Sequence, residues 1–198
     1  MVTPTFDISH NGRVTATRAA RADGACLRYR IDVVAPSAAD VVRSAGGWLY
    51  DRVMAGWEVT ALLTHDCDTL PLRILGVQAA DPKAGFPLTA AKSHSLAVSA
   101  EAFTADPRIR EQVLACLDDR LTEVALWGDG WPLGVNRTVT TAQYVLSSAA
   151  RRFKGYALAA AGMPCGSVSH TETLLCDVAT GRRWMQSWSG STSTPTSR

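Results

Sequence analysis

The chain has 198 residues, of which 46% are hydrophobic and 19% are charged. This is the composition of an ordinary globular protein with one domain, or with one domain and a small appendage. The net charge of +2 provides no strong basic or acidic field, so composition argues against a dedicated nucleic-acid binder. No run of about 18 apolar residues is present, and the N-terminal segment has no apolar signal core. We therefore expect a cytoplasmic protein that does not bind membranes.

The five cysteines support the same compartment. Their number is odd and no Cys-x-x-Cys pair occurs, so a disulfide framework is not indicated. The cysteines are Cys26, Cys67, Cys116, Cys165 and Cys176.

The domain organisation follows from changes in composition. Residues 1–24 are mixed polar, which predicts an N-terminal arm or an edge strand. Residues 25–186 carry alternating strand-like and helix-like patterns and are predicted to form a single α/β domain. Residues 187–198 are a Ser/Thr-rich tail that cannot bury apolar surface, so we expect this tail to be disordered.

The clearest supersecondary unit spans residues 26–63. Residues 26–34 read as a strand, and Ser37 with Asp40 fits a helix capping box in which each side chain bonds to the backbone of the other. Apolar residues then recur at helical spacing to Met54, Gly56 suits the helix end, and residues 57–63 read as a buried strand. Gly46 and Gly47 inside the helix predict a close approach, either to a sheet or to a ligand.

Further elements follow in order along the chain. Residues 72–76 and 95–99 read as short strands with a loop between them, and Asp106-Pro107 starts a helix that runs to residue 117. Residues 121–127 read as a strand, followed by a glycine-rich loop. Thr140 or Thr141 is expected to cap a long helix that ends near Ala161, and residues 172–178 suggest one more strand.

This alternation predicts an α/β fold. We expect a Rossmann-like open, mostly parallel sheet of about 4–6 strands with helices on both faces. The segment DRVMAGWEVTALL resembles the second half of a Rossmann-type βαβ unit, which implies a fold but not a function.

Polar residues follow several predicted strands, and parallel strands would bring them to one edge of the sheet. His65, Asp66, Asp68, Glu101 and Asp129 are the candidate catalytic residues at this edge, because acid–base or metal-assisted hydrolysis needs such groups. The candidate ligand-binding residues are Ser37, Gly128, Gly130 and Trp131. The competing interpretation is that these are solvated turns, in which Asp and Gly are common.

The common cofactor motifs are missing. The first strand-to-helix turn lacks G-x-G-x-x-G, and the chain contains no phosphate-binding G-x-x-x-x-G-K-[ST] loop and no G-x-S-x-G nucleophile elbow. Cys165, His170 and Cys176 match no standard zinc spacing, so no metal site is predicted. A Cys67 nucleophile beside His65 is a weaker alternative. The sequence identifies no cofactor.

Two groups suggest contacts with partners. Trp184 and Trp188 precede the tail and could form a protein-contact patch, whereas Arg151 and Arg152 form the basic edge of a helix. Because no catalytic motif is present, we predict a non-catalytic binding, regulatory or accessory protein whose partner is another protein or a small molecule. The alternative is a small metal-dependent or acid–base hydrolase using the strand edge. A nucleic-acid accessory protein is the second alternative.

Overall fold

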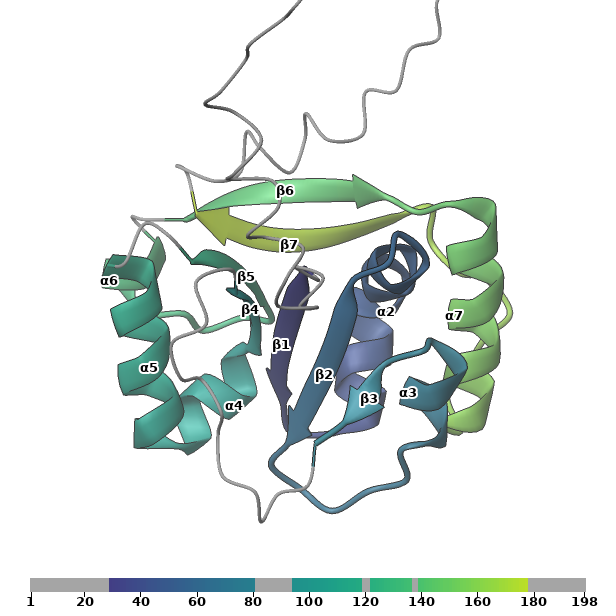
Figure 1. Cartoon of the computed structure of the whole chain (residues 1–198), viewed down its shortest axis with the longest axis horizontal. Coiled ribbons are helices and arrows are strands. Elements are labelled where there is room, and N and C mark those ends of the chain that lie inside the picture. Colours follow the sequence, from purple (N-terminus) through teal and green to yellow (C-terminus); the bar gives the residue numbers. More distant parts are fainter. Residues whose placement is uncertain (1–28, 81–93, 119–121, 137–138, 178–198) are drawn as a thin grey trace, which may run out of the picture.

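The computed structural model describes residues 29–80, 94–118, 122–136 and 139–177 (Figure 1). The predicted arm at 1–24 and tail at 187–198, with Trp184 and Trp188, lie outside the described residues. Within the described ranges, no helix is long and apolar enough to cross a bilayer.

Seven strands form one sheet in the order β3-β2-β1-β4-β5-β7-β6. The strands are β1 (Arg30–Ala35), β2 (Glu58–Leu63), β3 (Gln78–Ala79), β4 (His94–Ser99), β5 (Glu123–Trp127), β6 (Val139–Val145) and β7 (Thr171–Asp177). The strands from β1 to β5 pair in parallel, whereas β7 is antiparallel to both β5 and β6. An α/β fold with a mostly parallel sheet is thus confirmed, but the predicted number of strands is too low.

Helices cover both faces of the sheet, as predicted. They are α2 (Ala38–Met54), α3 (Leu70–Ile74), α4 (Ala100–Ala105), α5 (Pro107–Asp118), α6 (Leu133–Asn136) and α7 (Ser148–Ala160). In Figure 1, α2, α3 and α7 lie to one side of the sheet and α4, α5 and α6 to the other. The buried residues accordingly form two hydrophobic clusters, one on each face.

Helix α2 follows the predicted pattern, and its two glycines have a packing reason. A methyl group on Gly47 would lie 2.6 Å from Leu146 Cδ1, and one on Gly46 would lie 3.2 Å from Leu75 Cδ1. A methyl group on Gly47 would therefore force Leu146 to move, and one on Gly46 would make Leu75 give way slightly, so glycine suits both close contacts. The close approach that the sequence predicted is made in the structure by the side chains of Leu75 and Leu146.

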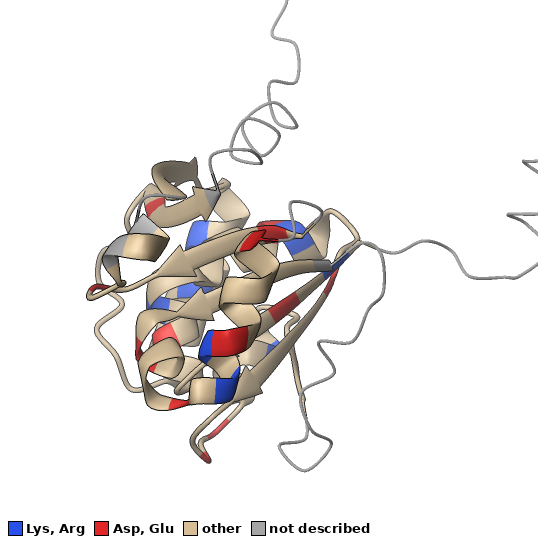
Figure 2. Ribbon diagram, turned by 90° about the vertical axis from the view of Figure 1, so that its left-hand side faces the viewer, with Lys and Arg blue, Asp and Glu red and all other residues tan. Residues whose placement is uncertain are grey.

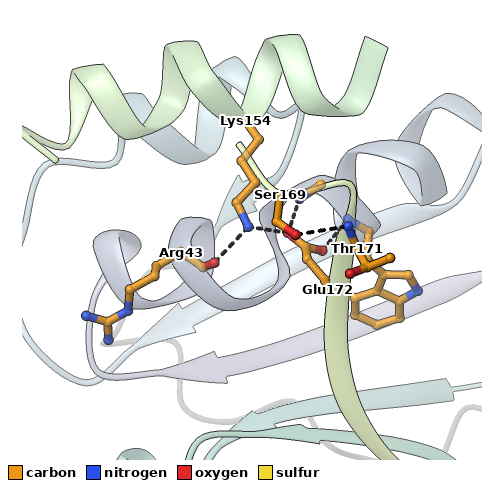
Figure 3. Close-up of polar contacts among 7 residues, drawn as sticks. Arg43, Lys154, Ser169, Thr171 and Glu172 are labelled. Atoms are coloured by element: carbon orange, nitrogen blue, oxygen red, sulfur yellow. Dashed lines mark hydrogen bonds and ion pairs between the residues drawn. The ribbon is translucent and has the colours of Figure 1, made fainter. Parts of the chain in front are cut away.

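A buried ion pair joins α2 to α7 and β7 (Figure 3). Lys154 Nζ lies 2.5 Å from Glu172 Oε1 and donates to the carbonyl of Arg43 at 2.7 Å. The Glu172 carboxylate also accepts from the backbone N–H groups of Gly47 at 2.9 Å and Trp48 at 2.7 Å. In a regular α-helix the N–H of Gly47 bonds to the carbonyl of Arg43. The ion pair thus bonds to both of these backbone groups in the middle of α2.

Two predicted elements are wrong. Residues 72–76 belong mainly to helix α3, which has Pro71 in its first turn, and the Asp68 carboxylate accepts from the N–H of Leu70 at 2.9 Å. This short apolar run looked like a strand because four or five apolar residues do not distinguish the two structures. Thr140 and Thr141 lie in strand β6, and Ser147 caps the last helix instead by accepting from Ala150 N.

Replacing Lys154 with methionine should destabilise the fold, because Glu172 would be left buried and unpaired. We expect the free energy of unfolding to fall by about 3–5 kcal/mol. Burial raises the pKa of Glu172 above its usual value, outweighing the opposite effects of Lys154 and the two N–H groups. Loss of Lys154 raises this pKa further, so the variant should lose stability as pH rises through the raised value. Urea denaturation at several pH values measures this slope.

The double variant Lys154→Met with Glu172→Gln is the matched control, because it contains no titrating group at this position. The free energy of unfolding of the double variant should not change with pH in the range where the buried Glu172 of the single variant titrates. Equal pH slopes for the single and double variants would contradict the ion pair.

Candidate active site

A pocket of about 560 Å³ opens at the edge of the sheet where the parallel strands β1, β4 and β5 end. Its walls come from α2, from the junction of β4 with α4, and from the loop after β5. The lining residues are Asp40, Arg43, Ser99, Ala100, Glu101, Thr104, Ala105, Gly128 and Asp129. Ligands of open α/β sheets characteristically bind at this edge.

Asp40 is the most enclosed charged residue of the pocket, with 8% of its surface exposed. Its Oδ2 accepts from the indole Nε1 of Trp127 at 2.9 Å, and its Oδ1 accepts from Arg43 Nη2 at 3.2 Å. Asp40 therefore has a donor on each oxygen.

The capping-box prediction is only half supported by these bonds. Ser37 Oγ does accept from the N–H of Asp40 at 3.3 Å. The Asp40 carboxylate, in contrast, bonds to Trp127 and Arg43, whereas a capping box would turn it back towards the N-cap backbone. The side chain is thus directed across the sheet edge, and it reaches the pocket wall.

Two further carboxylates complete the pocket. Glu101 lies in the first turn of α4 and Asp129 in the loop after β5, and both are exposed. Gly128 brings this loop close to α4, because it adopts φ +87° and an added methyl group would lie 3.1 Å from Ala100 Cβ. Three carboxylates from three separate elements therefore surround one cavity, as acid–base chemistry requires.

The other candidate catalytic residues do not line this pocket. His65, Asp66 and Asp68 follow β2 and are exposed, and Asp68 bonds to the start of α3. Their loop is held beside the end of β1 by a bond from His65 N to Pro36 O, and Cys67 Sγ accepts from Ala38 N at 3.4 Å. The structure thus brings Glu101 and Asp129 together and leaves the histidine loop outside the pocket lining.

Of the four predicted ligand-binding residues, Gly128 alone is in the pocket lining. Gly128 lines the pocket, whereas Ser37 caps α2. Gly130 adopts φ +88°, and Trp131 is buried with its ring centroid 4.8 Å from that of Phe103. Gly130 and Trp131 therefore shape the loop after β5 without lining the cavity.

The basic residues of α7 face elsewhere. Arg151 Nη1 lies 2.7 Å from His170 Nδ1, and Arg152 Nε donates to the Tyr156 hydroxyl at 3.0 Å. Neither arginine lines the pocket. Basic and acidic residues are interspersed over the ribbon in Figure 2, which agrees with the small net charge.

The described residues do not suit a bound metal ion. In ranges 29–80, 94–118, 122–136 and 139–177, no three His, Cys, Asp or Glu side chains are grouped as a metal site would need. Cys165 is exposed, Cys176 is buried, and His170 contacts Arg151. We therefore derive no chemical step through a metal.

Sequence reasoning missed Asp40, Arg43 and Trp127 as site residues. The sequence pattern assigned Asp40 to the capping box alone. The sequence signal that could have found Asp40 is its position in the first turn of the helix that follows β1. A parallel sheet binds its ligands at this edge.

Comparisons with known proteins show the fold. No family model and no curated protein matches the sequence. Among solved structures, a deacetylase triple mutant involved in the teicoplanin biosynthetic pathway superposes with a TM-score of 0.50 at 15% identity, covering 75% of this chain and 98% of that chain. The A40926 pseudoaglycone deacetylase Dbv21 gives a TM-score of 0.48 at 15% identity, covering 75% and 96%.

These structural neighbours overturn the main functional prediction. A non-catalytic binding or regulatory protein was inferred from missing motifs, but the solved structure that superposes with a TM-score of 0.50 is a deacetylase. The prediction failed because a site assembled from separate loops leaves no contiguous motif in the sequence. The alternative prediction, a hydrolase at the strand edge, agrees better with this finding.

The glycines of the loop after β5 allow a test of the pocket wall. Gly128 and Gly130 have nearly the same φ, but only Gly128 also approaches Ala100. Gly130→Ala should cost about 1–2 kcal/mol for the left-handed backbone. Gly128→Ala should cost more, because its methyl group also meets Ala100. Chemical denaturation of both variants measures the difference.

Gly134→Ala is the control, since Gly134 lies in α6 without a left-handed φ and with open space around it. We expect it to be neutral or slightly stabilising. A Gly128→Ala variant as stable as Gly130→Ala would refute the close contact with Ala100.

Proposed function

We propose that this chain is a small acid–base hydrolase that acts on a small-molecule amide in the pocket at the end of β1, β4 and β5. The observation that supports the proposal is that Asp40, Glu101 and Asp129 line the same cavity. Hydrolysis of an amide needs one group to take a proton from water and another to give a proton to the leaving amine. Several carboxyl groups around one substrate can divide these tasks.

Asp40 is suited to be the base. Both of its oxygens accept from donors, and these bonds hold the carboxylate in one orientation. Ionised Asp40 would take a proton from a water molecule as that water attacks the amide carbonyl. Glu101 or Asp129 would then give a proton to the nitrogen as the C–N bond breaks, giving a carboxylic acid and an amine, and the proton held by Asp40 would restore the donor carboxyl group through solvent.

The choice of an amide comes from the fold. A deacetylase involved in the teicoplanin pathway shares this architecture over 75% of the chain. That likeness supports an acyl amide as the substrate class, and the pocket geometry supports the acid–base residues. The proposal assigns no role to a protein partner.

Two finer expectations accompany this function. The parallel strands run in the order β3-β2-β1-β4-β5, and the same order in doubly wound sheets supports a Rossmann-like arrangement with the pocket near the switch between β1 and β4. The free thiols of Cys67 and Cys165 support a reducing, cytoplasmic location.

The activity can be tested with a panel of N-acetylated amines, acetylated amino sugars and acetylated amino acids. Release of acetate and of primary amine would be measured with the full chain, both with chelator and with added divalent cations. Asp40→Asn should lower kcat/KM by about a hundredfold or more, the usual contribution of a general base. Glu101→Gln and Asp129→Asn should also reduce turnover.

Asp66→Asn is the matched control, because Asp66 is exposed and lies outside the pocket lining. It should retain wild-type activity. Absence of hydrolysis across the panel, or equal activity of Asp40→Asn and wild type, would refute the proposal. Activity that appears only with a divalent cation and is lost with chelator would refute the metal-free acid–base form.

A further inference from the structure

Trp127 lies next to the pocket without lining it. It is the last residue of β5, it pairs with Ser99 in the parallel register, and 2% of its surface is exposed. Its indole N–H reaches past the end of β4 to Asp40, which follows β1. Because Trp127 does not line the cavity, it can affect the reaction only through residues that do, and its indole N–H bonds to one of them, Asp40.

We propose that Trp127 is a positioning residue that fixes the orientation of the Asp40 carboxylate, an inference that rests on the hydrolase function proposed above. The indole N–H only donates, so its partner must be an oxygen with a free lone pair. An ionised carboxylate accepts from both Trp127 and Arg43 and still has lone pairs left for a water molecule.

The two donors to Asp40 differ in strength. The side chain of Arg43 is 64% exposed, and such ion pairs contribute little because solvent screens them and the long side chain must be ordered. The Trp127 bond is shorter, at 2.9 Å against 3.2 Å, and both of its partners are buried. In a low-dielectric environment a fully paired bond of this kind is the more effective constraint. The hydrogen bond from Trp127 is therefore the stronger constraint on the orientation of the Asp40 carboxylate.

If Asp40 served only to stabilise the fold, its carboxylate could bond to a nearby backbone group. The backbone of α2 offers Asp40 an ordinary capping partner one turn away. The carboxylate instead bonds to a residue 87 positions later in the sequence. Asp40 also lines the cavity, where a base is useful.

Trp127→Phe removes the donor and keeps an aromatic ring in the core. We expect kcat to fall by about ten- to a hundredfold, as when partners that orient a functional ligand are removed. KM should change by less than about twofold, since no contact with substrate is lost. Adding Trp127→Phe to Asp40→Asn should cause little further loss, because both changes disable the same unit. Unchanged kcat, or a change confined to KM, would overturn the inference.

Trp48→Phe is the matched control for lost volume. Trp48 is fully buried in the same hydrophobic cluster as Trp127 and does not line the pocket. It should lose comparable stability in chemical denaturation while kcat stays within about twofold of wild type. An equal fall of kcat in both variants would assign the effect to general destabilisation and overturn the positioning role.

A measurement without substrate separates this inference from the proposed function. The indole ¹⁵N–¹H signal of Trp127, assigned by its loss in Trp127→Phe, should shift in Asp40→Asn and stay in place in Asp66→Asn. If the panel shows no hydrolysis, the proposed function fails while a shifted signal still supports the contact. An unshifted signal in Asp40→Asn would overturn the positioning role whatever the activity.

Discussion

The structure depends on a buried ion pair that bonds to the middle of a helix. Lys154 and Glu172 satisfy the carbonyl of Arg43 and the N–H groups of Gly47 and Trp48. A buried charge pair contributes net stability only when its remaining bonding capacity is filled. Here backbone groups of α2 fill it, so helix and ion pair are energetically interdependent. The pair also fixes α2 against α7 and β7, which lie far from it in sequence.

The position of α2 in turn determines the geometry of the pocket. The helix starts shortly after β1, and Asp40 in its first turn lines the pocket. Arg43, three residues further along the helix, lines the pocket as well. The glycines that admit Leu75 and Leu146 lie two turns further along the same helix. Packing at the centre of α2 and chemistry at its N-terminus are therefore parts of one rigid element, although different residues carry them.

Local patterns predicted the parallel half of the fold. Helix α2 was predicted from its cap and apolar spacing, and β1, β2, β4 and β5 from short buried runs. Helix α3 and strand β6 were missed, because a short apolar run and a threonine pair each suit two structures. Glu101 and Asp129 were identified from strand ends, but the orientation of Asp40 was not. That orientation depends on Trp127, and no local pattern encodes a contact across 87 positions.

The bond between Glu172 and Gly47 spans 125 positions of the chain. Contacts of such sequence separation form late in folding, because closing the intervening chain costs conformational entropy before the bond is gained. During synthesis, β1, β2 and β4 leave the ribosome well before β7 does. The bonds from Gly47 and Trp48 to Glu172 cannot form until β7 has been synthesised. Nascent chains that end before Glu172 should therefore populate a partly ordered state recognised by chaperones.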